Sequence, residues 1–454
     1  MDKVSHPLVC NESLLCEILS RLPVKSLMRF KCVSKPWLYL IKKDRYFIDL
    51  HFTRSNTAPK SISMLVAVFD SEKNKEMSLL STEIMLPYGG EDEHEGGGGR
   101  GVGTIQRKLL GPCSATRHRF LNGLICYIEK DEVKIDRVCV QNPSTGESTP
   151  WVSSLIRQQF GEDCSSVVLN ANGSATYKIS PTLSSCEFGY DPVTKEHKVV
   201  GLWGTGKWDM DGKIISEKCV CEVWTVGSNS WRRIDDHPRH DLVKMGFKST
   251  KYANGSIYWL GYSCSNDHCI IEFNVGSEKF REISLPNFIR DDIGVACGTK
   301  LIQIDGHLAI LALGMSYPSF QNNRIIWVNN TKTSTKMCIL YDINNDQDAR
   351  STSSASICSN YYWMEGTFLM PPFDPETGSR SIQTIPGTDL FIVRSYKDHD
   401  LSFYYYNWKK KSFSSSKFEV HGILELIQDY KVPVSLSELL IYTFRESILP
   451  VNPL

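Results

Sequence analysis

The chain has 454 residues, of which 41% are hydrophobic, 11% aromatic and 22% charged, a composition typical of a folded protein of two to four units with a sizeable core. Because 51 basic side chains balance 51 acidic ones, the chain as a whole lacks the charge excess of a general polyanion binder. We expect no secretory signal, since Asp2, Glu12 and Glu17 interrupt the N-terminal stretch, and no membrane span, since apolar runs such as 308–315 are too short.

Up to about residue 50 the apolar residues recur with the period of a helix. Leu15, Ile18, Leu19 and Leu22 share one face of a predicted first helix. The residue before a proline avoids the helical region, so this helix is expected to end near Leu22, before Pro23.

Two more short helices are predicted directly afterwards. Pro23 suits the first turn of a second helix, whose apolar side is formed by Val24, Leu27 and Phe30. Ser34 is suited to cap a third helix, with Pro36 in its first turn; the apolar face of this helix is formed by Trp37, Leu40 and Ile41.

These helices are both apolar and basic. Between Arg21 and Arg45 there are eight Lys or Arg residues and one acid, Asp44. A bundle this small cannot turn all its large apolar side chains inward, which favours a partner with an apolar groove and an acidic rim. The alternative is a solvated basic face on a structural cap. Nucleic acid is not expected, because the prolines cut every helix short of a recognition helix.

After residue 50, short β-branched and aromatic runs alternate with polar turns, as in "FGYDPVTKEHKVVGLW", "CEVWTVGSNSWRRI" and "IIEFNVGSEKFREISLP". This is a hairpin pattern, and its repetition at intervals of tens of residues is typical of a β-propeller, with a pair of β-sandwiches as the alternative. The glycine-rich stretch 89–103 is expected to be a flexible insertion. The strand "ELLIYTF" near the C-terminus is expected to pair near the first strand and close the ring.

Motifs for catalysis or metal binding are not found. The fifteen cysteines have irregular spacing and no Cys-x2-Cys pair, so we expect reduced thiols in the cytoplasm or nucleus, no structural zinc and no cofactor. Cys219 and Cys221 alternate on one strand face and are expected in the core, as are Trp224 and Trp231. "CSNDHC" at 264–269 offers only three metal ligands.

The segment "EILSRLPVKSLMRFKCVSKPW", with "FIDLH" after it, resembles an F-box of the large plant type. One departure is Val9 after Leu8, where the family usually has Leu-Pro. The stretches "FLNGLICY", "VCVQNPSTGE" and "NGSIYWL", with the hairpins quoted above, are similar to a plant F-box-associated domain of type 3, which is related to kelch-like propellers.

The resemblance implies a multidomain α plus all-β fold: a small three-helix F-box at 5–52 and a β-propeller-like F-box-associated domain at 60–450. It implies that the F-box docks on a Skp-type adaptor and through it on a cullin, in an SCF ubiquitin ligase, while the β-domain captures a protein substrate for ubiquitination. The implied adaptor-binding residues are Leu8, Leu15, Ile18, Leu19, Leu22, Pro23, Val24, Lys25, Leu27, Arg29, Val33, Lys35 and Trp37.

On this interpretation the chain is a non-catalytic receptor, with no metal, nucleic-acid or membrane partner. Three alternatives remain: a scaffold that binds the adaptor without promoting degradation, a free-standing kelch-like binding protein, and a propeller enzyme or sugar-binding protein.

Overall fold

The computed structural model of the chain describes residues 12–55, 61–70, 76–85, 102–110, 115–131, 134–160, 166–169, 175–209, 211, 213–239, 247–262, 268–286, 289, 299–312, 317–321, 324–328, 334–342, 356–358, 361–369, 381–385, 387–397, 400–410, 412–413, 419–421 and 440–451. Leu8 and residues 89–101 of the glycine-rich stretch lie outside these residues, and so does most of "CSNDHC".

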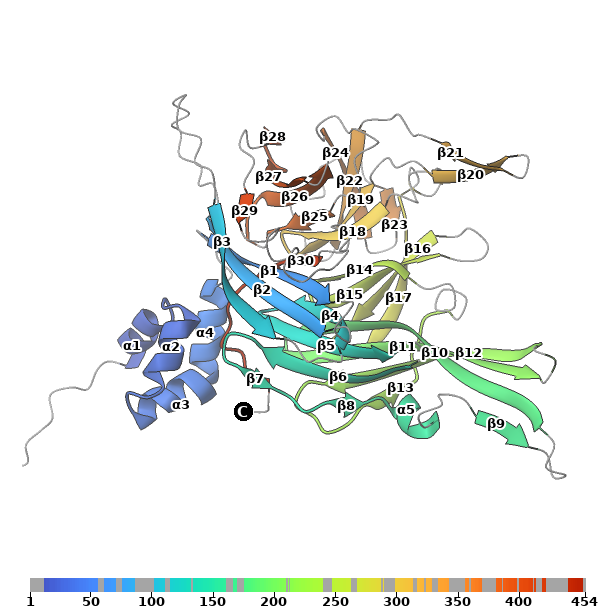
Figure 1. The fold of residues 1–454 in the computed structure, drawn as a ribbon, viewed down its shortest axis with the longest axis horizontal. Coiled ribbons are helices and arrows are strands. Elements are labelled where there is room, and N and C mark those ends of the chain that lie inside the picture. Colours follow the sequence, from blue (N-terminus) through green and yellow to red (C-terminus); the bar gives the residue numbers. More distant parts are fainter. Residues whose placement is uncertain are drawn as a thin grey trace, which may run out of the picture.

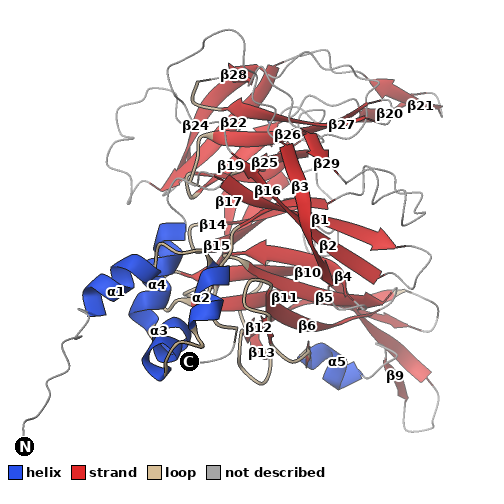
Figure 2. Ribbon diagram, turned by 60° about the vertical axis from the view of Figure 1, so that its left-hand side comes forward, coloured by secondary structure: helices blue, strands red, loops and turns tan. Residues whose placement is uncertain are grey.

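The described part begins with four helices, which lie together at one side of the strands (Figures 1 and 2). They are α1 (Glu12–Leu19), α2 (Val24–Phe30), α3 (Lys35–Lys43) and α4 (Arg45–Ser55). The three predicted helices are confirmed. Pro23 precedes α2 with an extended backbone, and the Ser34 hydroxyl accepts a hydrogen bond from Trp37 N at 3.3 Å, with Pro36 in the first turn of α3.

The fourth helix corrects the predicted three-helix module. Asp44 caps it, because Asp44 Oδ1 accepts a hydrogen bond from Phe47 N at 2.7 Å. Its buried side chains are Phe47, Ile48 and His51. One of these three is a histidine, so the apolar stripe that marks an amphipathic helix is incomplete in the sequence.

The remainder is a β-propeller-like succession of antiparallel sheets (Figure 2). The first sheet has the order β29-β3-β2-β1-β30, with β1 (Ser61–Asp70), β2 (Glu76–Met85), β3 (Val102–Leu110), β29 (Glu419–His421) and β30 (Leu440–Phe444). The second contains β4 (Ala115–Leu121), β5 (Leu124–Asp131), β6 (Lys134–Asn142), β7 (Glu147–Ser148) and β8 (Val152–Ser153).

The short helix α5 (Leu155–Phe160) leads to the third sheet, whose order is β13-β12-β11-β10-β9. Its strands are β9 (Ser166–Leu169), β10 (Ala175–Asp191), β11 (Glu196–Asp209), β12 (Ile214–Thr225) and β13 (Arg232–Ile234). The fourth sheet is a meander of β14 (Phe247–Ala253), β15 (Ser256–Tyr262), β16 (His268–Asn274) and β17 (Lys279–Ser284).

The fifth sheet has the order β18-β19-β22-β24-β23, with β18 (Thr299–Ile304), β19 (His307–Ala312), β22 (Ser334–Asp342), β23 (Ser356–Cys358) and β24 (Tyr361–Leu369). A separate hairpin is formed by β20 (Tyr317–Gln321) and β21 (Arg324–Val328). The last sheet is a meander of β25 (Ser381–Thr384), β26 (Leu390–Lys397), β27 (Asp400–Asn407) and β28 (Ser412–Phe413).

The two ends of the β-domain are joined through the first sheet. β30 pairs antiparallel with β1, with Ser63 opposite Phe444 and Ala67 opposite Leu440, so the predicted closure by the C-terminal strand is confirmed. Past β30 the chain crosses to the second sheet, where the buried Asn142 amide donates to the Ser447 carbonyl at 2.9 Å. Backbone and side-chain hydrogen bonds therefore both hold the ring closed.

The predicted interior residues are buried. Trp224 and Trp231 are 0% and 3% exposed, and Cys219 and Cys221 are 6% and 0% exposed. Trp224 and Trp231 belong to one continuous core that also contains the inner faces of the helices. The helical module is therefore packed onto the β-domain.

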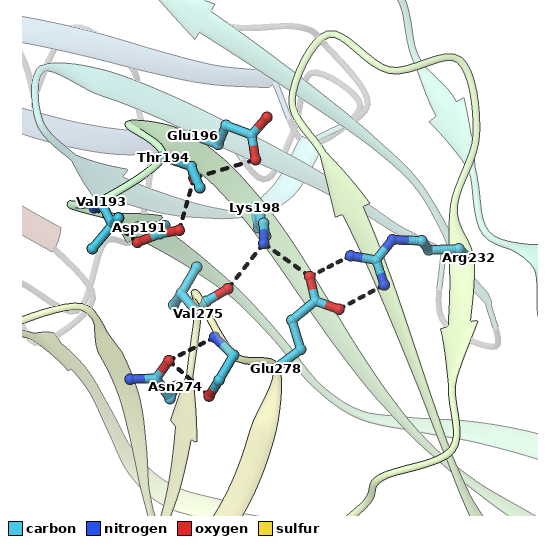
Figure 3. Close-up of polar contacts among 10 residues, drawn as sticks. Asp191, Val193, Thr194, Glu196, Lys198, Arg232, Asn274, Val275 and Glu278 are labelled. Atoms are coloured by element: carbon cyan, nitrogen blue, oxygen red, sulfur yellow. Dashed lines mark hydrogen bonds and ion pairs between the residues drawn. The ribbon is translucent and has the colours of Figure 1, made fainter.

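An ion network with a buried Lys198 joins the third and fourth sheets (Figure 3). Lys198 on β11 donates to the Val275 carbonyl at 3.0 Å and to Glu278 Oε1 at 2.9 Å, both in the turn between β16 and β17. Arg232 on β13 approaches the same carboxylate with both terminal nitrogens. Burial raises the pKa of Glu278, but the hydrogen bonds from Arg232 and Lys198 outweigh it and hold that pKa below its usual value.

Candidate functional site

Exposed large apolar side chains concentrate on the helical module. Eight such side chains are exposed in the described part of the chain, and six of them lie between residues 14 and 46. These six, which we call the apolar patch, are Leu14, Ile18, Val33, Leu38, Tyr39 and Tyr46, with exposed fractions from 40% to 66%. Isolated exposed apolar residues are ordinary, but such a density on one small module indicates a binding surface.

The patch exists because the helices are apolar on two faces. On α1, Leu19 is 2% exposed and packs inward, while Ile18, one position before it, is 54% exposed. On α3, Ile41 is 1% exposed whereas Tyr39 is 60% exposed. The inner faces pack in a core shared with the β-domain. The outer faces do not pack against the β-domain in the described part of the chain.

The structure separates the predicted adaptor-binding residues by their burial. The exposed members are Ile18, Pro23, Lys25, Arg29, Val33 and Lys35. The half-buried members are Leu15, Leu22 and Trp37, and the buried members are Leu19, Val24 and Leu27. The buried members pack in the chain's own core, so they shape the surface, whereas the exposed members are free to contact a partner.

Sequence reasoning missed four members of the patch: Leu14, Leu38, Tyr39 and Tyr46. The helical period gives one apolar stripe per helix, and these four lie off that stripe. The signal that could have identified them is a large apolar residue beside the inward-facing stripe of a helix. Tyr46 was further hidden because α4 was not predicted.

Basic side chains are also exposed on the helical module. Lys25, Arg29, Lys35, Lys43 and Arg45 are exposed, and within the described residues no ion pair involves any of them. Lys42, beside them, approaches the Glu147 carboxylate of the β-domain at 3.6 Å. These five exposed side chains, which we call the basic rim, present positive charge to an incoming partner and therefore favour encounter with an acidic one.

α4 makes the hydrogen bonds that orient α1. Arg54 Nη2 donates to both carboxylate oxygens of Glu17 at 2.6 Å, and Arg54 Nη1 donates to the Glu17 carbonyl at 3.0 Å. The hydrogen bonds from Arg54 and Arg21 lower the pKa of Glu17. His51 Nε2 lies 3.3 Å from the Leu22 carbonyl, at the end of the turn that follows α1. The helix that sequence reasoning missed thus fixes the orientation of α1.

The opposite side of α4 contacts the β-domain. Phe52 packs against Tyr190, with ring centroids 6.2 Å apart, and Asp49 forms an ion pair with Lys195. At the end of α4, Arg445 Nη1 donates to the Ser55 carbonyl at 2.5 Å. The patch therefore has a fixed orientation relative to the sheets.

The described residues give no support for metal binding or for catalysis by a cysteine nucleophile. They contain no group of three or more His, Cys, Asp or Glu side chains that could hold a metal ion. Burial raises the pKa of the Cys126, Cys186 and Cys221 thiols, which opposes formation of the reactive thiolate. No helix in the described part is long and apolar enough to cross a bilayer.

Two family models match the chain. The F-box associated beta propeller domain matches residues 103–442, and the F-box domain matches residues 10–49. The second match covers α1, α2, α3 and the start of α4, and the first covers the strands from β3 to β30 but not β1 and β2.

Relatives in Arabidopsis thaliana carry F-box protein names. At1g32420 is 29% identical over 61% of this chain and 75% of its own length, and At2g15640 is 26% identical over 67% and 65%. At5g65850 is 24% identical over 88% of this chain and 82% of its own length.

Proposed function

We propose that this chain, which belongs to the F-box proteins with an F-box associated β-propeller domain, is the substrate-recognition subunit of an SCF ubiquitin ligase. The helical module binds a Skp-type adaptor, and through it a cullin, and the β-domain holds a protein substrate for ubiquitination. The observation that carries this proposal is the concentration of six exposed apolar side chains, with a basic rim, on the four helices.

The apolar patch and its rim match what adaptor binding requires. An interface needs a desolvated apolar centre and a polar border, and Ile18, Val33 and Tyr39 are exposed enough to supply the centre. In this role the chain is a non-catalytic receptor. It needs no cofactor, nucleic acid or membrane, and acts in the cytoplasm or nucleus.

A matched pair of valines tests the adaptor contact. Val33 is 60% exposed in the patch, and Val193 is 86% exposed on the β10–β11 turn of the β-domain. We expect Val33→Asp to weaken binding to a purified Skp-type adaptor at least tenfold in calorimetry, because a charge would enter a desolvated interface. Val193→Asp should bind as the wild type does, and equal loss in both variants would refute the assignment.

The alternative of a non-degradative scaffold is separated by a second measurement. Proteins that co-purify with both wild type and Val33→Asp are substrate candidates. For the ligase function, their abundance must fall when wild type is expressed, and recover with a proteasome inhibitor or with Val33→Asp. Unchanged abundance in the presence of a bound adaptor and cullin would favour the scaffold.

A further inference from the structure

A cavity of about 580 Å³ lies where the helical module meets the sheets. Its walls come from the end of α4, the β4–β5 turn, β14, β18 with its turn, β25 with the turn after it, and the segment that follows β30. A volume of this size holds a small organic molecule. The adaptor contact proposed above does not use it.

The walls are rich in amide and hydroxyl side chains. These are Asn122, Thr250, Gln303, Gln383, Thr384 and Thr388. Gln383 Oε1 is buried and has no hydrogen-bond partner among the residues that the structure describes. Buried polar atoms are nearly always hydrogen-bonded, so this one is available to accept a hydrogen bond from a bound molecule.

Two cations also line the cavity. Lys251 reaches it from β14, and burial lowers the pKa of Lys251. Arg445 reaches it from the segment after β30, and burial lowers the pKa of Arg445 to about 10. Lys251 is half-buried and has no ion pair in the described part of the chain, and an ammonium partly withdrawn from water without a counter-charge is costly.

The acidic residues at the cavity do not neutralise Lys251. Asp305 is 44% exposed at its side chain and lies 3.6 Å from Lys409. Glu446 is exposed. Both carboxylates are therefore exposed to solvent, and no counter-charge for Lys251 is found among the residues that the structure describes.

We propose that this cavity binds a small hydroxylated anion of the sugar-phosphate class. Lys251 and Arg445 hold its anionic group, and the surrounding amides and hydroxyls bind its hydroxyl groups. Phe52 and Ser55 of α4 line the same cavity, so a bound molecule also contacts both the helical module and the β-domain and stabilises their packing. Ligand binding of this kind raises the stability of the whole chain by mass action.

The test measures binding to the full chain by calorimetry and by the shift in melting temperature. The probes are glucose 6-phosphate, glucose, inorganic phosphate and citrate, at ionic strength matched with sodium chloride. We expect glucose 6-phosphate to bind more tightly than phosphate or citrate, and glucose not to bind. If no anion stabilises the chain beyond sodium chloride, the proposal is refuted. If phosphate alone binds as tightly as glucose 6-phosphate, the assignment of a hydroxyl-binding site is overturned.

Variants locate the site. Lys251→Met should weaken binding of glucose 6-phosphate at least tenfold, without lowering the melting temperature of the free chain, because it removes a half-buried charge that has no ion pair in the described part. Lys251→Arg should restore most of the affinity, and Lys410→Met, on the exposed β27–β28 turn, should change nothing. Gln383→Leu provides a second, uncharged variant, which should also weaken binding if Lys251→Met fails to fold. Undiminished affinity in Lys251→Met would overturn the site, and intact adaptor binding by that variant keeps this outcome separate from the proposed ligase function.

Discussion

Two buried histidines should make the stability of the chain fall in mildly acidic solution. His118 is 2% exposed and His197 is 7% exposed. Burial, with a smaller effect of the Arg119 charge, lowers the pKa of His118 to about 4, and burial lowers the pKa of His197 to about 3. The His197 ring stacks on Phe188 with centroids 5.3 Å apart, a site that favours the neutral imidazole.

The sign follows from the direction of these shifts. Each folded-state pKa lies below the unfolded value of about 6.5, so the unfolded chain takes up protons first as the pH falls. The stability from these two groups is therefore fully present above pH 6.5 and is lost progressively below it. Lowering the pH from 7.5 to 5.5 therefore reduces the free energy of unfolding by about 1.4 kcal/mol for each histidine, and by about 3 kcal/mol for the pair.

Urea unfolding of the full chain at pH 7.5 and pH 5.5 measures this difference. The control is the double variant His118→Gln/His197→Gln, whose side chains cannot be protonated at either pH. We expect the wild type to lose about 3 kcal/mol more than the double variant over this interval. Equal losses in both proteins would show that the two imidazoles accept protons without cost in the folded chain, and would refute the reasoning.

Three further predictions concern single side chains. Glu278→Gln should cost about 2 kcal/mol in urea unfolding, because it leaves the Lys198 ammonium buried without its carboxylate, and the wild-type advantage should disappear as the pH falls below about 4.5; an unchanged midpoint would contradict it. Gly123→Ala should destabilise the chain more than Gly146→Ala does. At Gly123 (φ +78°) the added Cβ would lie 2.5 Å from Ser447 Cβ, whereas at Gly146 (φ +77°) it meets no atom within 4 Å and adds only about 1 kcal/mol of backbone strain. Equal shifts in melting temperature would contradict the steric argument. In the helical module, Leu27→Ala should lower the free energy of unfolding by about 2–5 kcal/mol, because Leu27 is 0% exposed. Ile18→Ala should change that free energy by no more than about 0.5 kcal/mol and weaken adaptor binding instead. Denaturation measures the first effect and calorimetry the second.

Local signals were enough to predict the first three helices and the closure of the β-domain. Ser34 and Pro36 act through neighbouring backbone atoms, so their effect is visible in a short stretch of sequence. The alternating run at residues 440–444 likewise needs only a free strand edge to pair with, and β1 provides it.

The fourth helix and the cavity could not be predicted in the same way. α4 is stabilised largely by groups distant in sequence, such as Glu17 for Arg54 and Tyr190 for Phe52, and tertiary contacts of this kind override weak local preference. Lys251 lies in the run "KSTKYANGS", which is ordinary strand and turn sequence. Its place in the cavity follows only when six separate segments of the chain converge around it.

The position of α4 gives the proposed receptor its geometry. On one side Arg54 fixes α1, and with it the apolar patch, through Glu17. On the other side Asp49 and Ser55 are tied to Lys195 and Arg445 of the β-domain. Because one short helix carries both sets of contacts, a substrate held by the sheets would keep a fixed orientation relative to an adaptor held by the patch. A change in these contacts should therefore reduce ubiquitin transfer more than it reduces binding of either partner alone, since transfer depends on the relative position of the two and each binding surface would remain intact.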